Sequence, residues 1–184
     1  MKKPLTVLPN FTILADANDP NYLDIIGCLR CFCYIESYAE HIDTYKITPK
    51  SFWYGMNATN RDFIQFLKEH SESLDGNVLK ELEKFQAKFG QIILLGETKL
   101  QIHSKDILDQ IKSNTKLKEM IQAIENTEVT LNEININELQ NILVEEIGYP
   151  FQLQRVEVNQ ISPLIQKLER NAEAWEKKNF HVSQ

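Results

Sequence analysis

The start of the chain carries the hydrophobic pattern of two strands, a helix and a further strand. Short apolar runs flank Pro9 and Asn10, and they predict a strand pair because proline and asparagine suit turns. Asp19 followed by Pro20 predicts a capped helix start. The apolar residues that follow recur at helical spacing, and they are Leu23, Ile26, Leu29 and Phe32. Residues 37–47 then predict a strand.

Three helices and a hairpin are predicted from Thr48 onward. Thr48 is a favourable cap, and Pro49 suits the first helical position. Asn60 is expected to cap the second helix, and the third is expected to lie between residues 76 and 90. Residues 91–103 predict a hairpin. Three helices followed by a two-stranded ribbon are typical of a winged helix.

Helices and strands alternate in the C-terminal half. Two amphipathic helices are expected first, over residues 106–112 and 116–124. A βαβ-like unit should follow, with its strand, helix and strand over residues 127–131, 137–147 and 151–158. Ser162 and Pro163 predict the start of a final helix, which runs through Leu164, Leu168 and Trp175.

These elements predict a mixed α/β fold. We expect a small N-terminal β-α-β lobe over residues 1–47, a winged-helix-like unit over residues 48–104 and a C-terminal α/β lobe over residues 105–184, packed as one compact domain. The 184 residues, 42% of them hydrophobic, can bury such a core. No apolar run has the length of a membrane span, and no signal sequence is recognised, so we expect a cytoplasmic protein without a membrane partner.

The net charge of -6 argues against autonomous, sequence-independent DNA binding, which depends on lysine and arginine. Lys80, Lys84 and Lys88 nevertheless share one side of the predicted third helix and are the candidate DNA contacts. Glu81 and Glu83 lie among them at i,i+3 pairing distance. A solvated helix face is therefore favoured over a DNA-binding face.

The search for a phosphate-binding loop is negative. ATP hydrolysis would require a glycine-rich loop ending in Gly-Lys-Ser/Thr, and the chain contains none. The segment from Gly96 to Lys99 lacks the flanking glycine and falls in a predicted hairpin. We therefore expect neither ATP nor magnesium to bind within this chain.

The cysteine and histidine residues give few further candidates for a catalytic or metal-binding site. Cys28, Cys31 and Cys33 are an odd number of thiols within one apolar helix and its exit, so buried, reduced side chains are favoured over a zinc site, which needs four ligands. His41 and His103 have no partner at triad spacing. A cysteine–histidine nucleophile stays open as the weakest alternative, because such partners meet only in space.

The segment from His41 to Trp53, His-Ile-Asp-Thr-Tyr-Lys-Ile-Thr-Pro-Lys-Ser-Phe-Trp, carries the most specific pattern. It resembles the H-x-H-x-Y-x-(L/I)-T-P-x-(S/A)-L-W signature in the N-terminal domain of XPB-like DNA repair helicases of the bacterial type. Three other segments resemble that domain in the same order, so the similarity runs from about Pro4 to Phe151. They are residues 4–16, 88–94 and 139–150.

The resemblance has departures. Asp43 stands where the family often has a second histidine, and Phe52 replaces the usual leucine. No clear match follows Val158, and the R-x-Y-Q element that opens the helicase motor is not reached. We expect either a fragment of a longer helicase or a standalone relative.

The resemblance implies an accessory domain that does not itself catalyse a reaction. In eukaryotic relatives the corresponding domain docks onto a partner subunit of TFIIH, and bacterial XPB-like helicases are similar to ATP-dependent 3′-to-5′ DNA translocases. The expected partners are a motor in cis, which would use ATP and magnesium, and another protein. Tyr45, Thr48 and Trp53 are the candidate structural or docking residues, with Trp53 expected in the core.

Three alternatives remain at this point. The first is a standalone interaction protein with the same fold, which would serve a separate motor. The second is a DNA-binding winged-helix module. The third and weakest is a small-molecule enzyme, because no sequence pattern announces a catalytic pocket.

Overall fold

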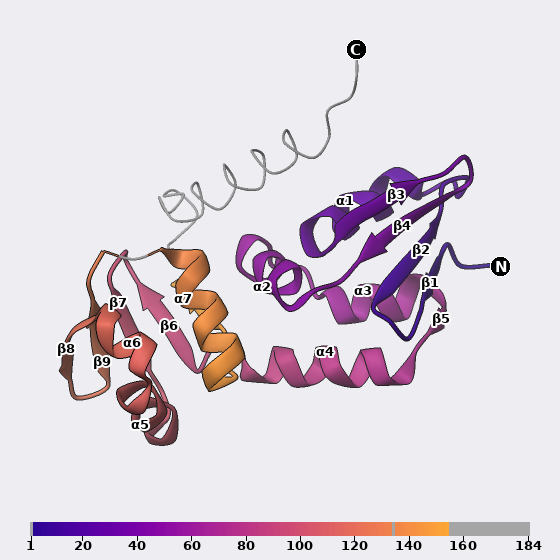
Figure 1. The fold of residues 1–184 in the computed structure, drawn as a ribbon. Coiled ribbons are helices and arrows are strands. Elements are labelled where there is room, and N and C mark those ends of the chain that lie inside the picture. Colours follow the sequence, from indigo (N-terminus) through magenta and orange to yellow (C-terminus); the bar gives the residue numbers. More distant parts are fainter. Residues whose placement is uncertain (1, 134, 155–184) are drawn as a thin grey trace, which may run out of the picture. The chain divides into compact units, whose positions relative to one another are not determined.

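The computed structural model describes residues 2–133 and 135–154, which form two compact units. The first unit runs to Ala87 and the second begins at Lys88. Each unit has its own mixed five-stranded sheet over the described residues (Figure 1). The prediction of a mixed α/β fold is confirmed.

The first unit is built on a sheet in the order β3-β4-β2-β1-β5. Its strands are β1 (Leu5–Val7), β2 (Thr12–Asp16), β3 (Tyr34–Tyr38), β4 (Ile42–Lys46) and β5 (Ser71–Leu74). Its helices are α1 (Tyr22–Phe32), α2 (Pro49–Ala58), α3 (Phe63–His70) and α4 (Gly76–Lys88). All neighbouring strands are antiparallel except β5, which pairs parallel to β1.

Apolar side chains cross this sheet in one row. Val7 pairs with Ile13, Ile13 with Tyr45, and Tyr45 with Ile35, so the row joins four strands. Residues directly opposite in a sheet point to the same face, so these four side chains lie on one side. This row belongs to the hydrophobic core to which the helices also contribute.

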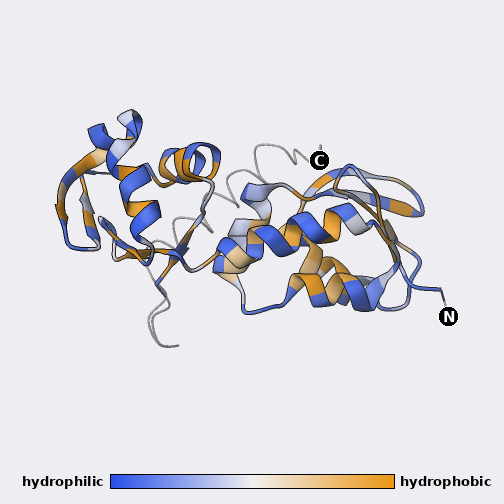
Figure 2. Ribbon diagram, turned by 90° about the horizontal axis from the view of Figure 1, so that it is seen from below, coloured by the Kyte–Doolittle hydropathy of each residue, from blue (hydrophilic) through white to orange (hydrophobic). Residues whose placement is uncertain are grey.

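The helices contribute their apolar stripes to the same core. Figure 2 shows hydrophobic and hydrophilic residues alternating along the helices of the first unit, as amphipathic helices require. The aromatic members are Phe32 of α1, Phe52 of α2 and Phe63 of α3, each almost fully buried. Phe32 stacks on Phe63, with ring centroids 4.5 Å apart.

The second unit places its sheet in the order β10-β6-β7-β9-β8. Its strands are β6 (Ile92–Leu95), β7 (Lys99–Ile102), β8 (Ile121–Glu125), β9 (Glu128–Leu131) and β10 (Phe151–Leu153). Its helices are α5 (Lys105–Ser113), α6 (Thr115–Met120), α7 (Ile136–Ile142) and the π-helix η1 (Leu143–Ile147). Because β10 is parallel to β6 and β7 is antiparallel to both β6 and β9, strands β9 and β10 run in the same direction. The predicted strand–helix–strand order is therefore present.

The winged-helix arrangement expected over residues 48–104 is replaced by a different one. Helices α2 and α3 belong to the first unit, whereas the β6–β7 hairpin belongs to the second. The physical reason is strand pairing, because β6 and β7 donate and accept hydrogen bonds with β10 and β9 and are not a free ribbon. The contacts place the division between units at residues 87 and 88, away from the expected positions at 47 and 104.

Several local predictions need correction. The strand expected over residues 37–47 is the β3–β4 hairpin, and β5 was not predicted. The helix expected over residues 116–124 ends at Met120, because the following residues form β8 and turn at Asn126 to pair with β9. The predicted final helix from Ser162 and the strand residues after Gln154 lie outside the described residues. Over the described part of the chain, every helix is too short or too polar to cross a membrane.

Two helix starts also differ. The side chain of Asp62, and not Asn60, caps α3 by accepting the Gln65 amide at 3.0 Å. Asp19 accepts the amide of Asn21, the residue that precedes α1, so it shapes the turn before that helix. Leu23, expected on the buried stripe, is largely exposed.

The contact between α1 and α2 depends on Gly55. A Cβ atom added there would lie 2.2 Å from the ring of Phe32, which is fully buried and cannot turn away. We expect Gly55→Ala to lower the free energy of unfolding by roughly 1–3 kcal/mol through overpacking. Urea unfolding measures this change.

Gly27 is the matched control, because it lies in α1 with no atom within 4 Å of its added Cβ. Gly27→Ala should raise the free energy of unfolding by about 0.5–1 kcal/mol, since glycine weakens a helix interior. Equal effects of the two substitutions would contradict the close packing at Gly55.

Candidate functional site

The segment from His41 to Trp53 joins a strand to a helix. Strand β4 ends at Lys46, and α2 begins at Pro49. The Thr48 hydroxyl oxygen accepts the Ser51 amide at 3.1 Å, and the Ser51 hydroxyl oxygen accepts the Thr48 amide at 2.9 Å. This capping box satisfies two amides at the helix end and fixes the angle at which the chain leaves the sheet. The structure thus places Thr48 in the capping position that its sequence context predicts.

Tyr45 lies on β4, an inner strand of the first sheet. Its side chain is fully buried, and its hydroxyl has no hydrogen-bond partner among the described residues. Burial, assisted by the negative charge of Asp43 two residues away, raises the pKa of Tyr45 to about 12. A neutral phenol is therefore held in the core, where it packs as an aromatic residue.

Asp43 is the departure from the family signature, and it is also buried. Desolvation raises the pKa of its carboxyl group, and the Ala39 amide that donates to it partly offsets that rise. Asp43 pairs with Tyr38 across the hairpin, so it holds the turn between β3 and β4. The sequence comparison alone left the role of this position open.

Trp53 and His41 lie at opposite ends of the signature. Trp53 is buried in α2, with 1% of its surface exposed, as the prediction of a core position requires. His41 is exposed, and its Nδ1 lies 3.2 Å from the side-chain nitrogen of Asn18. The signature therefore places its aromatic side chains in the interior and leaves its first two residues, together with Pro49 and Lys50, at the surface.

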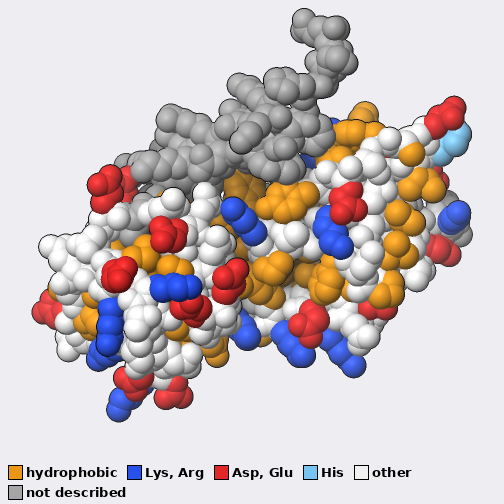
Figure 3. Space-filling model, viewed as in Figure 1, with side chains coloured by type: hydrophobic (Ala, Val, Ile, Leu, Met, Phe, Trp, Pro, Cys, Tyr) orange, Lys and Arg blue, Asp and Glu red, His pale blue; other side chains and the backbone are white. Residues whose placement is uncertain are grey.

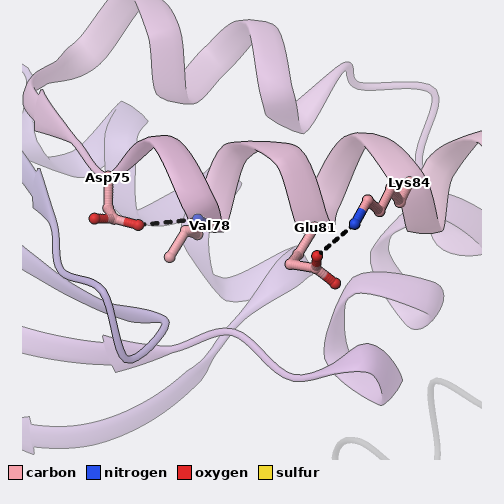
Figure 4. Close-up of polar contacts among 4 residues, drawn as sticks. All are labelled: Asp75, Val78, Glu81 and Lys84. Carbon is pink, nitrogen blue, oxygen red and sulfur yellow. Dashed lines mark hydrogen bonds and ion pairs between the residues drawn. The ribbon is translucent and has the colours of Figure 1, made fainter.

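Two of the three candidate lysines of α4, Lys84 and Lys88, have a charged or aromatic partner. Figure 4 shows Glu81 paired with Lys84 at 3.0 Å, one helical turn apart. Lys88 lies over the Tyr149 ring, with its nitrogen 5.5 Å from the ring centroid. Lys80 is exposed, but Glu83, its expected partner, pairs with Lys68 at 3.7 Å instead.

Asp75 fixes the start of α4 by accepting the Val78 amide at 3.0 Å (Figure 4). Val78 and Leu82 are buried on one side of α4, so the lysines on the opposite side are exposed to solvent. Paired, exposed charges on an amphipathic helix favour the interpretation of a solvated face.

The three thiols lie in surroundings that disfavour the thiolate form. Cys28 and Cys33 are buried, Cys31 is half-buried, and all three are free. Burial raises the pKa of each thiol, most strongly at Cys33, so the nucleophilic thiolate is disfavoured. Within residues 2–133 and 135–154, no group of histidine, cysteine and acidic side chains has the arrangement of a metal site.

A polar hollow of about 470 Å³ lies in the second unit beside α7 and η1. Glu146 at its wall accepts from Asn114 and pairs with Lys116 at 2.7 Å. Both contacts lower the pKa of the Glu146 carboxyl group, and the hydrogen bond from Asn114 has the larger effect. Sequence reasoning missed the hollow because its lining comes from separate polar positions on α6, α7 and η1 without a recognisable spacing. Among the described contacts of this hollow, no carboxylate or amide is arranged with another as a catalytic pair.

Comparison with protein families gives a match that covers most of the chain. Residues 5–125, well over half of the chain, match the family described as a helicase conserved C-terminal domain. The chain belongs to this family. It is thus a helicase-related domain, and the matched range includes the whole signature from His41 to Trp53. No curated protein matches the chain.

The cap at Thr48 can be tested by substitution. Thr48→Ala removes the oxygen that accepts the Ser51 amide and should lower the free energy of unfolding by about 1 kcal/mol. Thr48→Ser keeps that oxygen and should retain most of the stability. Thermal unfolding followed by circular dichroism distinguishes the two, and an equal loss in both variants would assign the effect to the methyl group.

Tyr45→Phe removes a buried hydroxyl without a described partner. It should raise the free energy of unfolding by about 1 kcal/mol at neutral pH, because that hydroxyl is desolvated without compensation. The folded pKa lies above the ordinary value of 10, so the contribution of neutral Tyr45 is present below pH 10 and is lost as pH rises through about 12. Urea unfolding of both proteins at pH 7 and pH 11 should show the smaller alkaline loss in the variant. Destabilisation by Tyr45→Phe at pH 7 would show that the hydroxyl has a partner.

Proposed function

We propose that this chain is the accessory domain of an XPB-like, ATP-dependent DNA repair helicase. It would act by binding a protein partner at a docking surface. The motor would lie outside these residues, and the domain would position it or recruit a partner. The observation that carries the proposal is the match of residues 5–125 to a helicase family. The matched range contains the signature from His41 to Trp53, whose aromatic side chains are buried in the fold.

The roles of the signature residues support docking over catalysis. Thr48 is engaged in a capping box, and Tyr45 and Trp53 are buried. Side chains that are enclosed in this way maintain a shape and do not meet a substrate. The raised pKa values of the cysteines point in the same direction, since they disfavour a thiolate nucleophile.

Charge supports a protein partner over DNA. The net charge is -6, and two of the three candidate DNA-contacting lysines are already engaged, Lys84 with Glu81 and Lys88 with Tyr149. Phosphate binding would have to break these contacts and overcome the overall repulsion. A DNA-binding module is therefore the less favoured function.

The reading frame beyond Gln184 gives the first test. We expect a Walker-type loop and an acidic magnesium-binding motif in the same frame. In that longer protein, deletion of residues 2–154, which removes both units whole, should leave ATP hydrolysis by the motor measurable but lower partner-stimulated DNA unwinding by roughly tenfold, a usual size for regulatory coupling. Loss of all ATP hydrolysis would instead make these residues part of the motor.

DNA binding is tested separately by titrating the 184-residue chain with duplex and forked DNA at low and physiological salt. We expect no detectable binding at either salt concentration. Binding at low salt that disappears when Lys80, Lys84 and Lys88 are replaced by glutamine would favour the DNA-binding alternative. Glutamine at Lys99 and Lys112, exposed lysines of the second unit, is the charge control.

A further inference from the structure

The outward side of α1 carries an exposed leucine beside a glycine. Leu23 has 79% of its surface accessible, and Gly27 follows it one helical turn later. The buried side of α1 consists of Ile25, Cys28, Leu29 and Phe32. Leu23, Gly27 and Arg30 lie on the opposite side at i, i+4 and i+7, and all three are exposed. Among the described residues of the first unit, nothing covers this side of α1.

Gly27 distinguishes this side of α1 from ordinary surface. Hydrophobic side chains are exposed elsewhere too, and Figure 3 shows them scattered over the strands of the first unit. A glycine inside a helix, however, lowers the stability of that helix. At Gly55 the packing of Phe32 requires a glycine, whereas a Cβ atom added at Gly27 would meet nothing within 4 Å. The space left open at Gly27 is therefore not used by the described chain.

Opposite charges flank Gly27 at equal distances along the helix. Asp24 precedes it by three positions and Arg30 follows it by three, so the two side chains project to opposite flanks of α1. Both are exposed, and neither forms an ion pair within residues 2–133 and 135–154. Arg61 lies on the flank of Asp24, where it is already hydrogen-bonded to the Cys28 side chain. The charges of Asp24 and Arg30 therefore remain available to another molecule.

These positions make the outward side of α1 complementary to itself under two-fold symmetry. In an antiparallel pair of α1 helices centred on Gly27, a residue three positions before the glycine lies level with the residue three positions after it in the other copy. Asp24 of one copy is then level with Arg30 of the other, within reach of that long side chain. Leu23 lies near the apolar stem of the same arginine. The two glycines leave room for a close crossing of the helices.

We infer that the outward side of α1 pairs with α1 of a second copy of this chain, with Gly27 at the crossing point. Leu23 supplies the apolar contact, and the pairs between Asp24 and Arg30 set the antiparallel orientation. One helix from each chain makes a small interface, so the pairing is weak and reversible. The inference goes beyond the proposed accessory function, because pairing would bring two copies of the domain together with any motors attached to them.

Sedimentation equilibrium of the 184-residue chain tests the pairing. We expect a concentration-dependent equilibrium between monomer and dimer that weakens as salt is added. Gly27→Leu should weaken the pairing by roughly tenfold or more, because the new side chain holds the helices apart. Gly76→Leu is the matched control, since a Cβ atom added at Gly76 also meets nothing within 4 Å. A chain that stays monomeric up to its solubility limit, or equal effects of the two substitutions, would overturn the inference.

Charge reversal tests the orientation of the two helices. Asp24→Arg and Arg30→Asp should each weaken the pairing by roughly tenfold, because each brings like charges together. The chain with both substitutions should pair as the parent chain does, and an equimolar mixture of the two single variants should pair better than either variant alone. Only contacts between copies produce this recovery. Circular dichroism confirms that each variant is folded. Single variants that fail to recover on mixing would contradict the antiparallel arrangement.

Unwinding by the longer helicase separates this inference from the proposed function. A monomeric chain whose Gly27→Leu substitution lowers partner-stimulated unwinding would assign the outward side of α1 to a different protein, and self-pairing would be wrong. Pairing of the 184-residue chain, together with a motor that does not respond to deletion of residues 2–154, would support the inference and remove the accessory function. The two proposals can therefore fail independently.

Discussion

The first unit depends on one steric constraint, the approach of α1 to α2 at Gly55. The Phe32 ring occupies the space where any other residue would carry its Cβ atom. That ring also stacks on Phe63 of α3 and tilts against Phe52 of α2, so one side chain of α1 contacts aromatic rings from both following helices. Offset and tilted aromatic contacts of this kind add to the free energy already contributed by burial. The helices are thereby positioned relative to the sheet by aromatic packing around a single glycine.

The signature acts on the same constraint from the sheet side. Tyr45 anchors β4 in the apolar row of the sheet, and three residues later Thr48 caps α2. Gly55 follows Thr48 by only seven positions, so the direction in which the cap starts the helix sets where Gly55 meets Phe32. The crossing of α1 and α2 therefore depends on the helix cap at Thr48, and the position of that cap depends on the register of β4 in the sheet. The range that matches the helicase family therefore includes a segment whose buried and capping residues are structural.

Sequence reasoning succeeded where the physical signal is local. The cap at Thr48, the turn of the β6–β7 hairpin at Gly96 and the apolar stripe of α4 depend on neighbouring residues, and their expected positions agree with the structure. It failed where pairing partners are distant. Strand β5 has the polar sequence Ser-Glu-Ser-Leu and exists because β1 offers it a parallel edge. Residues 121–125 have helical spacing, but the turn at Asn126 and the β9 strand override it.

The same distinction explains which parts of the candidate site could be anticipated. The core position of Trp53 follows from pattern, because an aromatic residue at helical spacing usually faces inward. The exposure of Leu23 could not be anticipated, since Leu23 fits a predicted buried stripe and its exposure becomes evident only when the rotation of α1 is known.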